Sequence, residues 1–293
     1  MIPFQNIKYF LPIACFILFF SSCTAPFDIK TADSEPVIVI YSCLSEDTVH
    51  QTVRVTQSSP YFELEPNKPV SNAIVTIKSS DDQIFELIET DEKGTYQTIT
   101  PMAAVAGITY HLTVSVDTDQ NGILAHYEAT ATMQKPFLIN SINIEERSIM
   151  GYKHFFLNLY AQEIAGPDYY CARVIINDSL QSVKLSRYAA FSDLGIDGKY
   201  LDGLTIFLLE DYENVEVDDN PANIFVRPGD KVTFCISLVE KGYHDFILQC
   251  QSEQRGENPF FGGPASNITT NISNGGIGYF TAFSTTKLDA KVP

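Results

Sequence analysis

The feature that most constrains the fold is a series of short β-strand patterns. Runs rich in β-branched and aromatic side chains, several with apolar and polar residues in alternation, are separated by Gly, Pro, Asn and Asp. This pattern predicts strands over residues 37–44, 52–58, 73–79, 84–89, 95–98, 109–116 and 124–133. Strands of this length and spacing within about 100 residues are typical of an all-β sandwich.

A second series of strands follows the Lys-Pro pair at residues 135–136. Strands are predicted over residues 137–145, 154–161, 169–176, 204–210 and 231–239. Only residues 241–254 have helical periodicity, because Tyr243, Phe246, Ile247 and Cys250 recur at three- and four-residue steps. We therefore expect an all-β protein of two β-sandwich domains, residues 37–134 and 135–293, with one short helix in the second.

The first 22 residues have the pattern of a lipoprotein signal peptide. Lys8 precedes an apolar run at residues 9–20, which is too short to cross a hydrocarbon core of about 30 Å. Two serines precede Cys23, and a lipoprotein signal peptidase requires small residues at those positions. Cys23 is therefore predicted to be the lipidated first residue of the mature chain, with residues 23–36 as a tether. The alternative is an ordinary signal peptide cut near Ser22, or an N-terminal membrane anchor.

The residue after Cys23 indicates the membrane. Thr24, in place of Asp, favours the outer membrane of a Gram-negative cell over retention at the inner membrane. No acidic cluster follows Cys23 closely enough to indicate export to the surface, so both the cell surface and the periplasmic face stay open.

Charge and motif content exclude several functions. The chain has 19 Lys and Arg against 36 Asp and Glu, a net charge of −17, which repels phosphate backbones and excludes nucleic acid as a partner. It contains no GxSxG, HExxH, P-loop or dinucleotide-binding motif, and its five His are scattered. We expect no enzymatic activity. The alternative that the sequence leaves open is a hydrolase built on two carboxylates.

One segment matches the calcium-loop pattern D-x-[DN]-x-[DN]-G-x5-E. Asp117, Asp119, Asn121 and Gly122 supply its first part, and Glu128 follows six residues after the glycine. The flanking residues have strand patterns, so Glu128 would lie about 20 Å from Asn121 along an extended chain. We therefore interpret the segment as an exposed hairpin turn. A Ca²⁺ site formed by Asp117, Asp119 and Asn121 without Glu128 is the alternative, and no other cofactor is expected.

The remaining cysteines fall mainly in strand patterns, where a thiol serves as a small apolar group. An oxidising compartment permits disulfides, and Cys235–Cys250 is the pair that we consider for one.

Thr48 and Ser179 each follow an Asp and precede an aliphatic residue. These triplets resemble the short O-glycosylation sequon of exported Bacteroidota proteins.

Two resemblances extend over most of the chain. Residues 69–77, 90–96 and 107–114 resemble the Ig-like sandwich of the carboxypeptidase-regulatory or transthyretin-like kind, which implies a scaffold. Residues 257–268 and 271–280, the helix before them and residues 191–198 resemble an uncharacterised family of Bacteroidota outer-membrane lipoproteins, DUF4249. Some members of that family are encoded beside TonB-dependent transporters, and the family supplies no catalytic residues.

The family resemblance implies a location and a partner. We expect a lipid-anchored outer-membrane protein that acts as a non-enzymatic accessory or substrate-capture component of a TonB-dependent transporter. The alternative is a surface adhesin or glycan-binding lipoprotein, in which aromatic pairs such as Tyr61-Phe62 or Phe260-Phe261 stack on sugar rings.

Overall fold

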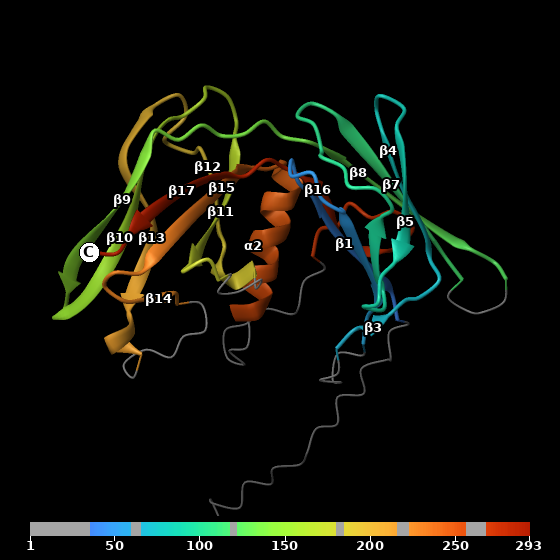
Figure 1. Ribbon diagram of the computed structural model, residues 1–293, viewed down its shortest axis with the longest axis horizontal. Helices are drawn as coiled ribbons and strands as arrows, with labels where there is room; N and C mark the ends of the chain where they lie inside the picture. The colour runs from blue at the N-terminus through green and yellow to red at the C-terminus, as the bar shows by residue number, and fades with distance from the viewer. Residues whose placement is uncertain (1–35, 60–65, 118–121, 180–184, 216–222, 256–267) are drawn as a thin grey trace, which may run out of the picture. The chain divides into compact units, whose positions relative to one another are not determined.

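The computed structural model describes residues 36–59, 66–117, 122–179, 185–215, 223–255 and 268–293. These residues belong to one compact unit, Pro36–Pro293, and most of them lie in strands of three β-sheets (Figure 1). The one α-helix among them is α2 (Lys241–Arg255), which confirms the helix predicted over residues 241–254. The all-β class is therefore confirmed. Helices of the length and apolar character needed to cross a membrane are absent from the described part of the chain.

The first sheet has nine strands, in the order β16-β1-β2-β6-β5-β4-β7-β8, with β3 paired to β2. Its strands are β1 (Ile38–Leu44), β2 (Thr52–Gln57), β3 (Lys68–Pro69), β4 (Ile74–Ser79), β5 (Ile84–Glu89), β6 (Thr95–Thr98), β7 (Thr109–Val116), β8 (Ala125–Thr132) and β16 (Ile277–Ala282). Alternate apolar residues of these strands, such as Ile38, Ile40 and Leu44 of β1, are buried in one shared core.

The two end strands of the first sheet, β8 and β16, lie close to each other, so the sheet curls around its core. The side chain of Asn271 bridges them. Its amide nitrogen donates to the carbonyl oxygens of Thr130 (3.1 Å) and Phe280 (2.7 Å), and its amide oxygen accepts from the Phe280 N–H (2.9 Å). Asn271 therefore supplies hydrogen bonds where the two strands are not paired directly.

The C-terminal stretch contributes to both parts of the chain. The sequence placed all of residues 135–293 in a second domain, but β16 pairs with β1 in the first sheet, and Ile272 and Phe280 belong to the first core. β16 runs parallel to β1, with Val39 opposite Ile277 and Leu44 opposite Ala282. The sequence did not predict this strand, because glycines at 275, 276 and 278 weaken its β pattern.

The second and third sheets each have four strands. The second sheet has the order β14-β13-β10-β9, and the third has the order β12-β11-β15-β17. Their strands are β9 (Ser141–Ile149), β10 (Tyr152–Gln162), β11 (Tyr169–Ile176), β12 (Ala189–Ser192), β13 (Tyr200–Asp211), β14 (Phe225–Val226), β15 (Lys231–Leu238) and β17 (Thr286–Lys291), with 3-10 turns η2 (Leu185–Arg187) and η3 (Tyr212–Asn214). Side chains of both sheets, including Leu157, Phe207 and Phe234, meet in one core.

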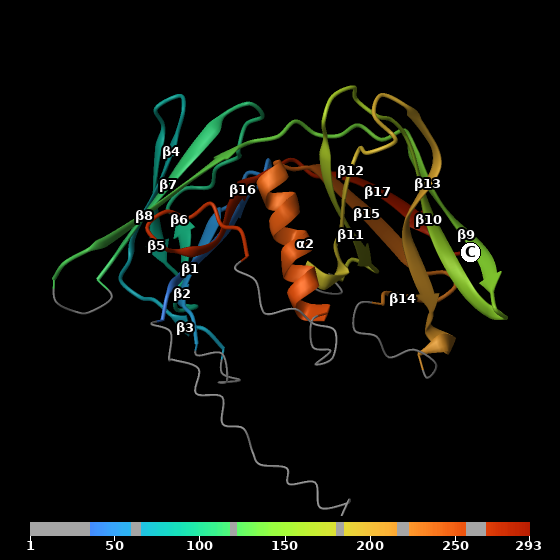
Figure 2. The ribbon, with the colours of Figure 1, turned by 180° about the vertical axis from the view of Figure 1, so that it is seen from behind.

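The third sheet has an apolar inner face and a more polar outer face. In β11, Ala172, Val174 and Ile176 belong to the core shared with the second sheet. Because successive side chains of a strand point to opposite faces, Cys171 and Arg173 lie on the outer face. Helix α2 packs against this part of the molecule, where it contacts β11, β12 and β16 (Figures 1 and 2).

Two crossing segments connect the first sheet to the others. Residues 133–140 lead from β8 to β9, and residues 283–285 lead from β16 to β17. The two segments run beside each other, because Gln134 forms a parallel bridge with Phe283 and the Thr286 hydroxyl donates to the Phe137 carbonyl (2.6 Å). The last two strands of the chain therefore tie the first and third sheets together.

The approach of β16 to β1 can be tested at Gly278. Its φ is +107°, and a Cβ at this position would lie 2.0 Å from the Ile40 carbonyl oxygen. Gly275 also has a positive φ (+75°), but a Cβ there would meet nothing within 4 Å. We expect Gly278→Ala to lower the free energy of unfolding by about 3 kcal/mol, and Gly275→Ala, the matched control, by about 1 kcal/mol. Urea denaturation measures both; equal losses would contradict the close approach.

Candidate functional site

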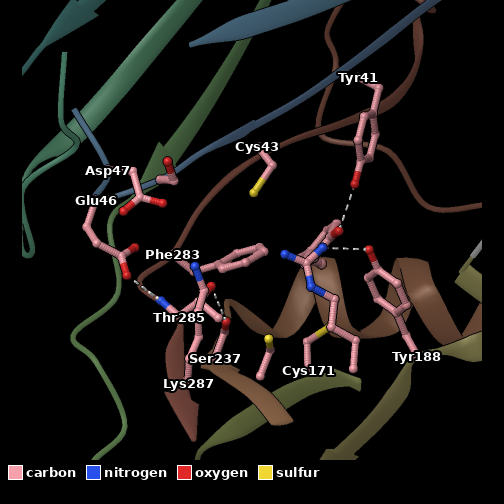
Figure 3. Close-up of a pocket in the computed structure, with 14 residues that line it drawn as sticks. Tyr41, Cys43, Glu46, Asp47, Cys171, Tyr188, Ser237, Phe283, Thr285 and Lys287 are labelled. Carbon is pink, nitrogen blue, oxygen red and sulfur yellow. Dashed lines mark hydrogen bonds between the residues drawn. The ribbon is translucent and has the colours of Figure 1, made fainter. Parts of the chain in front are cut away.

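A pocket of ≈ 390 Å³ lies where β1, the outer face of the third sheet and helix α2 meet (Figure 3). Each of these elements contributes to its wall, and so does the crossing segment between β16 and β17. The lining residues are Tyr41, Cys43, Ser45, Glu46, Asp47, Cys171, Arg173, Tyr188, Cys235, Ser237, Tyr243, Phe283, Thr285 and Lys287.

Two rows of side chains from the third sheet form one wall. In the first row, Arg173 of β11 is paired with Cys235 of β15, which is paired with Lys287 of β17. In the second row, Cys171 is paired with Ser237, whose hydroxyl lies 3.0 Å from the Thr285 hydroxyl. The register of the three strands therefore aligns a guanidinium, an ammonium, hydroxyls and thiols on one surface.

Arg173 is the half-buried cation of this wall. Its Nη1 donates to the Tyr188 hydroxyl (3.1 Å), and its guanidinium carbon lies 5.9 Å from the centroid of the Tyr188 ring. The thiols of Cys171 and Cys235 also lie near the guanidinium, and negative charge on either would raise the pKa of Arg173. Among the described residues, no carboxylate forms a salt bridge with Arg173. A guanidinium has five N–H donors, so most of its hydrogen-bonding capacity remains available.

Helix α2 positions Tyr188. The buried side chain of Gln251 donates from Nε2 to the carbonyl oxygens of Leu185 and Tyr188, both at 2.8 Å. These bonds hold the segment between η2 and β12 against the helix, and so place the Tyr188 ring beside Arg173. Helix α2 therefore helps to position the Arg173 guanidinium, because it holds the Tyr188 residue that accepts a hydrogen bond from Arg173.

Two tyrosines join β1 to the helix at the pocket. The hydroxyls of Tyr41 and Tyr243 lie 2.9 Å apart. Burial raises the pKa of both phenols above the ordinary value, and for Tyr41 the negative charge of a Cys43 thiolate would add to this effect. Both side chains therefore stay neutral at physiological pH, as hydrogen-bond donors and acceptors.

The thiols of the pocket are protonated. Burial raises the pKa of Cys43 and of Cys171 to about 12, and this effect outweighs the opposing effect of the Arg173 cation. Burial also raises the pKa of Cys235, although Arg173 and Lys287 oppose it. Because the thiolate is the nucleophile and metal ligand, these thiols are suited to neither role at neutral pH. Within the described ranges, no three His, Cys, Asp or Glu side chains are placed to hold a metal ion.

Carboxylates occupy the opposite side of the pocket. Glu46 and Asp47, in the exposed bend that follows β1, lie across from Tyr188 (Figure 3). Glu46 Oε1 accepts from the backbone N–H of Thr285 (2.9 Å), which ties this bend to the crossing segment. The ring of Phe283 lies between the two sides. The pocket thus has the Arg173 cation on one side, two carboxylates and the exposed Lys287 on the other, and an aromatic ring between them.

A second group of acidic side chains surrounds the loop of residues 193–198. Burial, together with the negative charges of Glu163, Asp193 and Asp197, raises the pKa of Asp168. The buried Glu163 accepts from the Tyr170 hydroxyl (2.9 Å) and the Gly198 N–H, and Asp193 accepts from the Asp168 N–H (3.0 Å). These carboxylates hold the loop through hydrogen bonds to its backbone.

The calcium-loop segment lies only partly within the described residues. Asp119 and Asn121 lie outside them. Asp117 Oδ2 accepts from the Gly122 N–H (2.8 Å), as a turn-forming Asp does. Glu128 lies in β8 opposite Thr113 of β7, so the two segments pair as a hairpin.

The other predicted positions are dispersed. Cys235 and Cys250 are free thiols: Cys235 lies in the pocket wall, whereas Cys250 packs among the side chains beneath α2, so different elements surround them. Thr48 and Ser179 are exposed. Cys23 and the aromatic pairs Tyr61-Phe62 and Phe260-Phe261 lie outside the described residues.

The pocket residues Arg173, Tyr188 and Lys287 were not among the site residues predicted from the sequence. A signal for Arg173 was available, because it alternates with Ala172 and Val174 in a strand pattern and must therefore face away from their core. Nothing local indicated that this face is covered by β1 and α2, which come from distant parts of the chain.

The raised thiol pKa values can be measured. At about pH 8, we expect Cys43 and Cys171 of the native protein to react with iodoacetamide roughly a thousandfold more slowly than in the protein unfolded in guanidinium chloride, because the thiolate fraction is lower by about three pKa units and access is reduced. Pulse alkylation followed by mass spectrometry of the peptides gives each rate. Native rates within about tenfold of the unfolded rates would contradict the buried, protonated state.

Comparisons with known proteins identify the family. No curated protein sequence matches the chain. The model of the family described as a domain of unknown function, DUF4249, matches residues 24–289, which include all the lining residues of the pocket. The chain therefore belongs to the DUF4249 family.

Proposed function

We propose that this protein is a lipid-anchored component of the outer membrane that captures a small ligand and works with a TonB-dependent transporter, without catalysing a reaction. The pocket between β1, the third sheet and α2 is the observation that carries the capture function. Its volume of ≈ 390 Å³ lies within the range of roughly 300–1,000 Å³ that is common for small-molecule sites. Its lining combines aromatic rings and thiols with several convergent polar and charged groups, which can orient a ligand.

The chemistry of the pocket favours binding over catalysis. Nucleophilic catalysis needs an activated nucleophile, usually with a lowered pKa or an adjacent base. Here, burial raises the pKa of the thiols and of the two tyrosines, so these groups remain neutral. The groups available to a ligand are hydrogen-bond donors and acceptors, the half-buried cation of Arg173, the exposed cation of Lys287 and two carboxylates.

The sequence supports the location. Cys23 follows a signal-peptide pattern, and residues 23–36 are long enough to serve as a tether between the lipid and β1. In this proposal, the first sheet is an Ig-like scaffold of the carboxypeptidase-regulatory kind, and the second and third sheets form a C-terminal β-sandwich. The association with a transporter rests on the resemblance to outer-membrane lipoproteins encoded beside such transporters.

The anchor is tested by metabolic labelling with a radioactive fatty acid. We expect the wild-type protein to be labelled and to sediment with outer membranes. Cys23→Ser should be unlabelled, because the thioether to the lipid cannot form. Labelling of Cys23→Ser, or of neither protein, would contradict the anchor.

The partnership is tested by affinity purification of the tagged protein from detergent-solubilised outer membranes. We expect a TonB-dependent transporter to co-purify with the wild type. Tagged Cys23→Ser, mixed with the same membranes, is the control that separates direct association from shared membrane location. Recovery of no transporter with the wild type would contradict the proposed partnership.

A further inference from the structure

We propose that the pocket binds a small zwitterion of the amino-acid or short-peptide class, whose carboxylate pairs with Arg173 and whose ammonium group faces Glu46 and Asp47. This proposal rests on the capture function proposed above and specifies its ligand.

Although the chain is strongly acidic, Arg173 has no carboxylate partner among the described residues. Two exposed arginines differ: Arg54 forms a salt bridge with Glu92, and Arg147 with Glu145. The exposed Arg227 instead stacks on the ring of Tyr212. Arg173 is less exposed than Arg54 and Arg147, and its one hydrogen bond to an oxygen within the described ranges goes to the Tyr188 hydroxyl. Of these three cations, the one most withdrawn from water is therefore the one that has no counter-ion in the described part of the chain.

A half-buried cation of this kind favours an anionic ligand. Withdrawal of a charge from water is unfavourable unless an opposite charge or hydrogen bonds compensate for it. A carboxylate fits the planar guanidinium through two parallel N–H···O bonds, and such bonds are stronger in a site of low dielectric constant. The Ser237 and Thr285 hydroxyls in the adjacent row hydrogen-bond to each other, which leaves one O–H of the pair as a further donor at this wall. Arg173 is therefore suited to bind the carboxylate of the ligand.

A second observation is the position of Glu46 and Asp47. Both lie on the side of the pocket opposite Tyr188, and therefore opposite the guanidinium that donates to Tyr188 (Figure 3). A ligand that carried only negative charge would meet repulsion on that side. A ligand with an ammonium group beyond its carboxylate would find an opposite charge at both ends.

The space between the two charged sides suits an organic body. Phe283 and Tyr243 provide aromatic surface there, and the protonated thiols of Cys43 and Cys171 are weakly polar. The backbone and apolar side chains of an amino acid or a dipeptide would bury against this surface. Lys287, at the exposed end of the Arg173 row, lies on the side of Glu46 and Asp47 (Figure 3), where the two carboxylates outnumber its single positive charge.

The test uses the full chain purified in detergent and a panel of dipeptides with apolar, polar, acidic and basic side chains. Each dipeptide is prepared in three forms: free, amidated at the C-terminus and acetylated at the N-terminus. Isothermal titration calorimetry gives the dissociation constants. We expect at least one free dipeptide to bind, its amidated form to bind at least about tenfold more weakly, and its acetylated form to bind several-fold more weakly, because each modification removes one charge.

Variants test which residues bind the carboxylate and the ammonium group of the dipeptide. Arg173→Gln should abolish binding of the free dipeptide, Arg173→Lys should restore part of it, and Asp47→Asn should weaken the free form while leaving the acetylated form unchanged. Arg54→Gln, which removes an exposed arginine of the first sheet, is the matched control and should bind as the wild type does. Thermal unfolding of each unliganded variant shows that the fold is retained.

Three outcomes would overturn the proposal. They are no binding of any free dipeptide at up to about 10 mM, equal binding of the free and amidated forms, and equal binding of the free and acetylated forms. Failure of the ligand assignment is distinguishable from failure of the proposed function. Co-purification of a transporter without dipeptide binding contradicts only the ligand class, whereas dipeptide binding without a transporter contradicts only the partnership.

Discussion

The parallel pairing of β16 with β1 is the constraint on which the arrangement of the described sheets depends. It requires Gly278, because a Cβ there would overlap the Ile40 carbonyl oxygen. Only residues 283–285 separate β16 from β17, the last strand of the third sheet. A strand held in the first sheet is thus followed almost at once by a strand held in the third. Neither sheet can move far from the other without breaking one of these ladders.

The pocket is a consequence of this connection. β1 brings Tyr41 and Cys43 to one side, and the third sheet brings Arg173 to the other, because the crossing segment sets the distance between them. Helix α2 then contributes Tyr243 and, through Gln251, holds Tyr188 beside the cation. Residues that form the site come from elements more than 200 positions apart, yet their placement follows from two strand registers and one helix.

The chemistry of the site depends on burial more than on residue type. Three cysteines beside an arginine would suggest reactive thiolates if the site were open to water. In this pocket, desolvation raises the pKa of Cys43 and Cys171 more than the Arg173 cation lowers it. The same withdrawal from water strengthens hydrogen bonds to the guanidinium, so one physical cause suppresses nucleophilic chemistry and favours anion binding.

Features that depend on neighbouring residues could be predicted from the sequence: the β class, the helix over residues 241–254, most strands, and the adjacent strands now seen to pair as β7 and β8. Alternation and helical periodicity are local signals, so they survive without knowledge of the fold. The pairing of β16 with the first sheet, and the position of Arg173 facing β1 and α2, could be known only from the folded chain. Strand pairing between residues far apart in the chain depends on which edges and faces meet, and the glycine-rich residues 275–278 give little local indication of a strand.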